Sequence, residues 1–300
     1  MSFVLDPWAL LGLAIMLISQ AATLGGVEPF ASWNTPICWT GFILFADTVV
    51  YRARGHSWIR SAPREFAALA LASIPLWLVF EGYNLVIRNW VYVGLPENRA
   101  LRLFGYAWSF ATIWPAIFEG AELASLARRR AGGPGEAGGS GRTALPASPA
   151  LPASPASPAL PALPALVSIA VGALMLVSPF LVSPDIARFL AAPVFIGFIF
   201  LLDPINGRMG AETLTRDRTT NLMLSGLICG VLWEFWNYWA RARWIYTVPI
   251  MQELKLFEMP LPGYLGFLPF AIECFTMYIF GRALYVSLAS ERQRGRTIAL

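Results

Sequence analysis

The segment WEFWNYWARARWIY, residues 233–246, places two polar side chains, Glu234 and Asn237, within a run of tryptophans. Residues three apart lie on one face of a helix, so these two groups are expected to be neighbours. The first half of the chain contains FEGYN, in which Glu81 and Asn84 keep the same ExxN spacing. The two segments predict a pair of related helices, each with a carboxyl and an amide group side by side.

The two halves of the chain share three further short motifs in the same order. The pairs are GFILFAD at 41–47 with GFIFLLD at 197–203, WVY at 90–92 with WIY at 244–246, and PAIFE at 115–119 with PFAIE at 269–273. Motifs that recur in order at a nearly constant spacing indicate an internal duplication. We therefore expect equivalent polar residues to meet near a central axis.

The composition is typical of a membrane protein. Apolar residues make up 57% of the 300 residues and charged residues only 13%, which lies outside the range of soluble globular domains. Apolar helices of roughly 17 to 25 residues span the hydrocarbon, and several stretches approach this length. They are approximately Trp8–Gly25, Pro36–Tyr51, Phe66–Tyr83, Gly105–Ala127, Leu166–Leu181, Phe189–Leu202, Asn221–Trp239 and Gly263–Ser287. The prediction is an all-α, polytopic integral membrane protein with eight transmembrane helices.

Each half holds four of these segments, an even number, so both halves enter the membrane in the same direction. We predict two parallel four-helix repeats, residues 1–130 and 166–300, related by a twofold axis along the membrane normal. Residues 131–165 between them are rich in Pro, Ala and Gly, with a proline at every third position from Pro146 to Pro164. This pattern predicts an extended cytoplasmic linker, and a docking site for a proline-binding partner is the alternative.

The basic residues indicate the orientation. With a cytoplasmic N-terminus, most of the 22 Lys and Arg residues fall in the inner loops and tail, so both termini are predicted to be cytoplasmic in a bacterial inner membrane. No Lys or Arg precedes Arg52, and the first segment is expected to be a retained helix instead of a signal peptide. The net charge of +4 follows from this distribution and does not indicate nucleic-acid binding.

Cysteine and histidine usage gives no sign of a bound metal. The three cysteines lack paired spacing, and His56 is the one histidine of the chain. Neither a disulfide framework nor a histidine-ligated metal is expected. We expect no cofactor, and the expected partners are membrane lipids and a lipid-soluble small molecule.

Four glutamates fall within the predicted membrane helices. They are Glu81, Glu119, Glu234 and Glu273. An ionised carboxylate at the bilayer centre costs about 2.5 to 3.5 kcal/mol, so these side chains are expected to face the bundle interior and to retain protons. Such groups are candidate general acids and bases, expected to line an intramembrane cavity, although polar side chains also join membrane helices by hydrogen bonds.

Polar and aromatic residues near these glutamates are candidates for substrate binding. They are Asn84, Asn237, Trp233, Trp236, Trp90, Tyr92, Trp244, Tyr246, Asp47 and Asp203. Tryptophan rings can stabilise a passing cation. Each type of residue also has a structural alternative: the asparagines can join helices, the aromatic residues can form an interfacial belt, and the aspartates can pair with Arg52 and Arg208.

The second half, WEFWNYWARARWIYTVP followed by FLPFAIECFTMY, resembles the lycopene cyclase domain of the heterodimeric type. The resemblance implies an isoprenoid cyclase in which a carboxylic acid protonates a double bond, a second double bond attacks, and a base removes a proton. It assigns the family's W[D/E] position to Glu234, with Glu81 as counterpart, and its proline–acid position to Glu273, with Glu119. Here a single Glu follows the proline by four residues, where the family usually has PxEE.

These observations lead to one expected function and two alternatives. The expected function is acid–base cyclisation of an isoprenoid or carotenoid dissolved in the membrane, with Glu234 and Glu273 as the first candidates for the chemistry. The first alternative is a transporter or carrier in which the same carboxylates bind protons or a cationic solute. The second is a membrane scaffold without catalysis.

Overall fold

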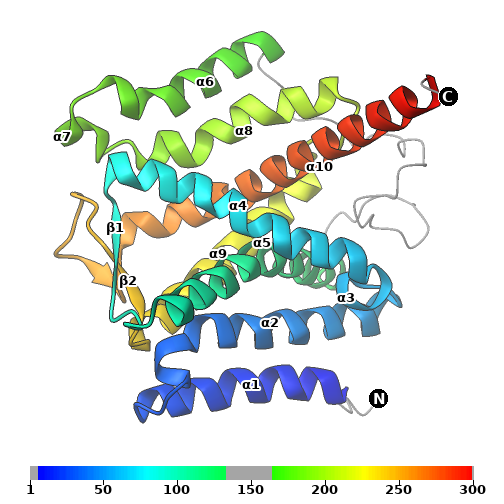
Figure 1. The fold of residues 1–300 in the computed structure, drawn as a ribbon. Helices are drawn as coiled ribbons and strands as arrows, with labels where there is room; N and C mark the ends of the chain where they lie inside the picture. Colours follow the sequence, from blue (N-terminus) through cyan, green and yellow to red (C-terminus); the bar gives the residue numbers. More distant parts are fainter. Residues whose placement is uncertain (1–5, 133–163, 299–300) are drawn as a thin grey trace.

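The computed structural model describes residues 6–132 and 164–298, and this part of the chain is mainly helical (Figure 1). Each predicted apolar segment coincides with one long helix. The long helices are α1 (Pro7–Leu24), α2 (Phe30–Arg54), α4 (Pro63–Ile87), α5 (Arg99–Arg130), α6 (Ala165–Leu181), α8 (Ala191–Arg208), α9 (Arg216–Trp239) and α10 (Phe267–Ile298). The all-α class is confirmed, and the predicted linker lies almost entirely outside the described residues.

Short elements connect the long helices. They are the helical turns α3 (Trp58–Ser61) and α7 (Pro184–Ala187), the strands β1 (Trp90–Val93), β2 (Arg243–Tyr246), β3 (Lys255–Leu256) and β4 (Met259–Pro260), and the 3-10 helix η1 (Leu261–Gly266). The strands form two antiparallel pairs, β1 with β2 and β3 with β4. The sequence had predicted no strands, because each is at most four residues long and lacks a pattern of its own.

Within the described residues, four segments are long and apolar enough to cross a membrane: α1, α4, α8 and the stretch Leu261–Ala289 that includes most of α10. The helix α6 is also apolar but shorter, at 17 residues. Polar residues lower the hydropathy of α2, α5 and α9, and some of them are buried, including Asp47, Glu119 and Glu234. Polar groups that face the protein interior are the kind that membrane helices tolerate.

The helix pair α1–α2 lies on one side of the molecule and the pair α6–α8 on the other, with α4, α5, α9 and α10 between them (Figure 1). Glycines allow the two helices of each outer pair to approach each other closely. A Cβ atom on Gly12 would lie 2.6 Å from the carbonyl oxygen of Gly41, and one on Gly172 would lie 2.7 Å from that of Gly197. Small residues let membrane helices approach closely, which accounts for the glycine that begins each GFILFAD-type motif.

The ends of the helices follow local capping rules. Asp6 accepts a hydrogen bond from the backbone N–H of Trp8 at the start of α1, and Asn98 accepts two from the first turn of α5. Such side chains satisfy backbone donors that a helix leaves unpaired. Arg88, in the left-handed region at φ 51°, ends α4 and turns the chain into β1.

The prolines of the PAIFE and PFAIE motifs lie at different positions in their helices. Pro115 lies inside α5, whereas Pro269 lies in the first turn of α10, where a proline removes no intrahelical hydrogen bond. The helix α2 is interrupted at Trp33, three residues before Pro36, where the backbone dihedral angles are not helical.

Candidate active site

Both asparagines of the ExxN motifs bind the strand that follows their helix. The amide of Asn84 donates to the Trp90 carbonyl at 2.8 Å and its oxygen accepts from the backbone N–H of Trp90 at 3.2 Å. Asn237 makes the same two bonds with Trp244, at 2.9 and 3.0 Å. The asparagine side chains thus fix where β1 and β2 begin. This is a structural role, and neither asparagine lines the cavity described below.

The strands β1 and β2 form an antiparallel ribbon of defined register. Trp90 lies opposite Tyr246, and Tyr92 lies opposite Trp244. Each tryptophan of one WxY motif therefore faces the tyrosine of the other. Gly94, at φ 64°, follows β1, and a Cβ atom there would lie 2.0 Å from the carbonyl oxygen of Arg241, so only glycine fits this close approach.

The tyrosine of each ribbon strand donates to the glutamate of its own half. The Tyr92 hydroxyl lies 2.5 Å from Oε1 of Glu81, and the Tyr246 hydroxyl lies 2.8 Å from Oε1 of Glu234. Burial, followed by the charge of Glu81, raises the pKa of the Tyr92 phenol well above its usual value. Burial and the charge of Glu234 do the same for Tyr246. Both phenols therefore remain proton donors at neutral pH.

The two glutamates differ in how many donors they accept. Oε1 of Glu81 also accepts from the indole nitrogens of Trp77 at 2.8 Å and Trp90 at 3.3 Å. Glu234 is fully buried, and its Oε2 has no hydrogen-bond partner in the protein. Several donors to a carboxylate favour its ionised form, so the arrangement around Glu81 suits a carboxylate better than that around Glu234.

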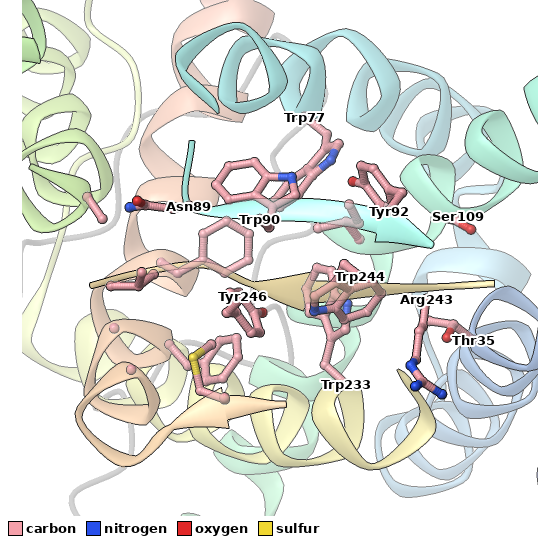
Figure 2. A pocket seen from close by; sticks show the side chains of 18 of the residues that line it. Thr35, Trp77, Asn89, Trp90, Tyr92, Ser109, Trp233, Arg243, Trp244 and Tyr246 are labelled. Atoms are coloured by element: carbon pink, nitrogen blue, oxygen red, sulfur yellow. The ribbon is translucent and has the colours of Figure 1, made fainter. Parts of the chain in front are cut away.

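A cavity of about 530 Å³ lies against the ribbon. Figure 2 shows β1 and β2 crossing it, with Trp77 and Trp233 on opposite sides of the ribbon. Fourteen aromatic residues line the cavity. They are Trp33, Trp39, Trp77, Trp90, Tyr92, Tyr106, Phe110, Phe189, Phe195, Trp233, Trp244, Tyr246, Phe267 and Phe270. Half of the chain's twelve tryptophans therefore border one cavity.

Aromatic rings from both halves of the chain meet beside the ribbon. Trp233 lies 6.0 Å from Trp77, 5.9 Å from Trp244 and 6.0 Å from Phe270, measured between ring centroids. Their side chains enclose an apolar volume whose walls present ring faces and edges. Trp236, also expected to bind substrate, packs against Trp39 at 4.8 Å instead and is not part of the cavity wall.

The expectation that the four glutamates line the cavity is corrected by the structure. None of them belongs to the cavity wall, which has no Asp or Glu among its residues. Glu81 and Glu234 lie behind Tyr92 and Tyr246, which do line it. The sequence analysis named both the glutamates and the WxY residues as candidates, but it did not predict that the phenol lies between the carboxyl group and the cavity.

Glu119 and Glu273 are fully buried in α5 and α10, away from the ribbon motifs. The Glu273 carboxyl group has no hydrogen-bond partner in the protein at either oxygen, whereas the Glu119 carboxyl group lies beside that of Asp47. A buried carboxyl group without a partner is costly in its ionised form. The structure therefore does not bring these two glutamates together with Glu81 and Glu234 in one cluster of contacts.

The aspartates of the GFILFAD-type motifs bind the loops that follow their helices. Oδ1 of Asp47 accepts from the backbone N–H of Ile59 at 2.7 Å, and Oδ1 of Asp203 accepts from that of Leu214 at 2.9 Å. Neither aspartate lines the cavity. These bonds indicate a structural role at the loops.

The expected ion pair between Asp47 and Arg52 is absent. Nε of Arg52 lies 3.7 Å from Asp6, and Nε of Arg60 takes the place beside Asp47 at 3.9 Å. Asp203 makes no ion pair within residues 6–132 and 164–298. The arginine five residues after each aspartate points elsewhere, because five residues of helix place it on a different face.

Several cavity residues were missed by the sequence analysis. They are Trp33, Thr35, Trp77, Arg102, Ser109, Arg188 and Arg243. Apart from Arg243, they lie outside the repeated motifs, and they come from separate elements that meet only in the folded chain. Comparisons with protein-family models, curated proteins and solved structures find no match for this chain.

Proposed function

We propose that this chain is an integral membrane enzyme that cyclises or isomerises a lipid-soluble isoprenoid by acid–base chemistry. The observation that carries the proposal is the aromatic cavity with the Tyr92–Glu81 and Tyr246–Glu234 pairs at its wall. An apolar substrate fits a cavity lined mainly by aromatic rings. The resemblance of the second half to the lycopene cyclase domain supports the same substrate class.

The proposed architecture is a duplicated bundle of eight transmembrane helices with both termini in the cytoplasm of a bacterium. Three pairs of matching contacts support it: the glycine contacts of α1–α2 and α6–α8, the aspartate bonds to the loops, and the asparagine bonds to β1 and β2. An even number of helices in each half makes the two halves parallel. An antiparallel ribbon that joins their outer ends is consistent with a twofold axis along the membrane normal.

In the proposed reaction Glu234 is the acid. Its Oε2 has no partner and can carry the proton, while Oε1 accepts from the Tyr246 hydroxyl. The Tyr246 hydroxyl gives its proton to a terminal double bond of the substrate. Its oxygen then takes the Glu234 proton after the carboxyl group turns to present Oε2–H, which leaves Glu234 ionised. The protonated double bond becomes a tertiary carbocation, which the π electrons of a neighbouring double bond attack to form the ring.

Glu81 is the proposed base. The ring-closed cation loses a C–H proton to the Tyr92 oxygen as the Tyr92 hydroxyl proton passes to Glu81, so a double bond re-forms and the net change is an isomerisation. The donors from Trp77, Trp90 and Tyr92 support a carboxylate at Glu81 before this step. Rings of the cavity wall face the cation during the reaction, and cation–π attraction between desolvated groups contributes about 2 kcal/mol.

The test is expression in a bacterium that accumulates a linear carotenoid or another polyprenyl compound, with pigments and lipids separated by chromatography and identified by mass. We expect a product of unchanged mass and altered retention, absent with Glu234→Gln and present with Glu97→Gln, an exposed control. An unchanged lipid profile with the wild-type chain, together with wild-type behaviour of the Glu234→Gln and Glu273→Gln variants, would contradict the proposal.

A carrier is the second candidate, favoured by Glu119 and Glu273. Both carboxyl groups are buried outside the cavity wall, with only the Asp47 carboxyl group beside Glu119, as expected for groups that bind and release protons during transport. Proton uptake into liposomes that contain the purified protein separates the two candidates. A flux that Glu119→Gln abolishes, without any change in added isoprenoids, favours the carrier.

A further inference from the structure

One end of the cavity carries hydrogen-bond donors that have no partner. Figure 2 shows Thr35, Ser109 and Arg243 at this end, beyond the ring of Trp244. Thr35 Oγ1 and Arg243 Nε are buried and make no hydrogen bond in the protein, and both residues line the cavity. Buried polar atoms almost always have a hydrogen-bond partner. The Thr35 hydroxyl has none, and Arg243 Nε has only an ion-pair contact with Glu258, so both groups are available to an acceptor in the cavity.

Trp33 adds a third orphaned donor. Its indole Nε1 is buried without a partner, and Trp33 lines the same cavity two residues before Thr35. An indole N–H can only donate. Its position follows from the interruption of α2 at Trp33, where φ is −120° and ψ is 28°, because this break turns the segment before Pro36 toward the first turns of α5, where Trp33 contacts Gly105.

The charge at this end is positive. Arg102 lines the cavity and makes no ion pair within the described residues. The guanidinium of Arg243 is partly compensated, since its Nε lies 3.6 Å from Glu258 and its NH1 donates to the carbonyl groups of Tyr238 and Ala240 at 3.4 Å. The cavity wall contributes no acidic residue to balance these charges.

The opposite end of the cavity differs because its polar groups already have hydrogen-bond partners within the protein. Arg188 donates to the Thr247 carbonyl at 3.2 Å. The amide of Asn89 lies 2.9 Å from the Ile87 carbonyl and 3.0 Å from that of Arg188. Unused donors are therefore concentrated at the end near Thr35, and a ligand would be oriented by them.

We propose that the cavity binds an amphiphilic anion, namely an isoprenoid with a phosphate head. The head contacts Arg102, Thr35, Trp33 and Arg243, and the chain lies among the aromatic rings beside the ribbon. The inference rests on the proposed function for the isoprenoid chain, whereas the anionic head follows from the donors alone. An oxyanion offers several acceptors to a set of donors, and charge-assisted bonds from arginine are the stronger kind. The hydrocarbon then extends toward Tyr92 and Tyr246, which places its double bonds at the proposed acid and base.

The experiment measures binding without turnover, on the full-length protein purified in a neutral detergent. Geranylgeranyl monophosphate, geranylgeraniol, inorganic phosphate and phosphatidylglycerol are titrated separately. Intrinsic tryptophan fluorescence reports binding, because six tryptophans border the cavity. We expect the monophosphate to bind about tenfold more tightly than the alcohol, the contribution of one or two charge-assisted hydrogen bonds, and inorganic phosphate to bind weakly.

Two variants and one control locate the head. Arg102→Gln and Thr35→Val are each expected to weaken monophosphate binding by about fivefold or more while leaving the alcohol unchanged. Arg99→Gln, one turn earlier on α5, exposed and outside the cavity, is the control and should bind like the wild type. Thr35→Val keeps the shape of the side chain, and size-exclusion chromatography verifies that it is folded.

Three outcomes overturn the proposal in distinct ways. Equal affinities for the alcohol and the monophosphate would show that the cavity does not recognise an anionic head. If Arg99→Gln loses as much affinity as Arg102→Gln, the monophosphate is attracted by the overall positive surface charge and not by the cavity residues. Displacement of the monophosphate by an equal concentration of phosphatidylglycerol shows that the head belongs to a membrane phospholipid and removes the isoprenoid chain. Product formation in the cell assay without selective monophosphate binding would leave the enzyme proposal standing and refute only the head group.

Discussion

Trp90 lies directly opposite Tyr246 in the antiparallel ribbon, so each strand contributes one ring and one phenol to the same cavity wall. The two halves of the chain therefore share a single site, and neither half encloses it alone. Substitutions at matched positions in the two halves should reveal which of their contacts are equivalent and which differ.

The first prediction concerns the unequal surroundings of the two glutamates. Glu81→Gln replaces a carboxyl group that accepts three hydrogen bonds by an amide, whose oxygen is a weaker acceptor. We expect this substitution to lower the free energy of unfolding by about 1 to 3 kcal/mol. Glu234→Gln loses one such interaction and should cost about 1 kcal/mol or less. Thermal unfolding in detergent, followed by circular dichroism, gives both values. A larger loss for Glu234→Gln would contradict the assigned acceptor pattern.

The second prediction tests the phenol as the group that meets the substrate. Tyr246→Phe keeps the ring in the wall and removes the hydroxyl that contacts Glu234. We expect product formation to fall by about 10² to 10⁴-fold, the usual contribution of general acid catalysis. Tyr264→Phe is the control, since its hydroxyl donates to the Leu256 carbonyl outside the cavity wall. Undiminished product from Tyr246→Phe would rule out the proposed acid.

The third prediction concerns the titration of the ribbon phenols. Burial and the neighbouring glutamates raise the pKa of Tyr92 and Tyr246 in the folded protein, whereas an unfolded phenol titrates near pH 10. The folded state thus retains these protons where the unfolded state releases them, and the stability they contribute is lost as the pH rises above about 10. Tyr92→Phe and Tyr246→Phe should flatten the fall of the melting temperature above this pH. Identical pH profiles for variants and wild type would contradict the shifts.

The fourth prediction concerns the glycine contacts of the outer helix pairs. Gly41→Ala and Gly172→Ala would place a Cβ atom 2.7 and 2.5 Å from backbone atoms of the neighbouring helix, and overpacking of this kind costs about 1 to 3 kcal/mol. Gly82→Ala on α4, with no atom within 4 Å of the added Cβ, should leave the melting temperature unchanged or raise it. A destabilised Gly82→Ala variant would show that the helical glycines are sensitive for another reason.

The positions of the long helices could be predicted from the sequence because hydropathy is a local property. All eight apolar segments coincide with helices, although only four of the described segments meet a strict criterion of length and hydropathy. Glu234 and Tyr246 were both named as candidate site residues, but their hydrogen bond was not predicted. The ribbon register could not be foreseen, because it depends on contacts between residues about 150 apart. The phenol and carboxyl groups are only 11 or 12 residues apart, but the local pattern does not show which of them faces the cavity.

The cavity end near Thr35 illustrates the same limit. Thr35, Arg102 and Arg243 come from three separate elements, and a threonine or an arginine near a helix end carries no special signal in a single sequence. Their common feature is that folding brings all three to the wall of one cavity. Glu119 and Glu273 are the opposite case, since they were easily noticed as charges in apolar segments, yet the structure places them outside the cavity wall.

The register of the ribbon has a consequence for the origin of the chain. A WxY strand that pairs antiparallel with another WxY strand, tryptophan against tyrosine, is self-complementary. Two identical copies of one half can therefore form the same ribbon across an isologous interface, as symmetric homodimers do. In the proposed duplicated architecture, fusion of two such subunits would make the ribbon intramolecular and free the two Tyr–Glu pairs to diverge. The hydrogen bond from Trp77 to Glu81, which no hydrogen bond to Glu234 matches in the described residues, is the kind of asymmetry that a homodimer cannot encode.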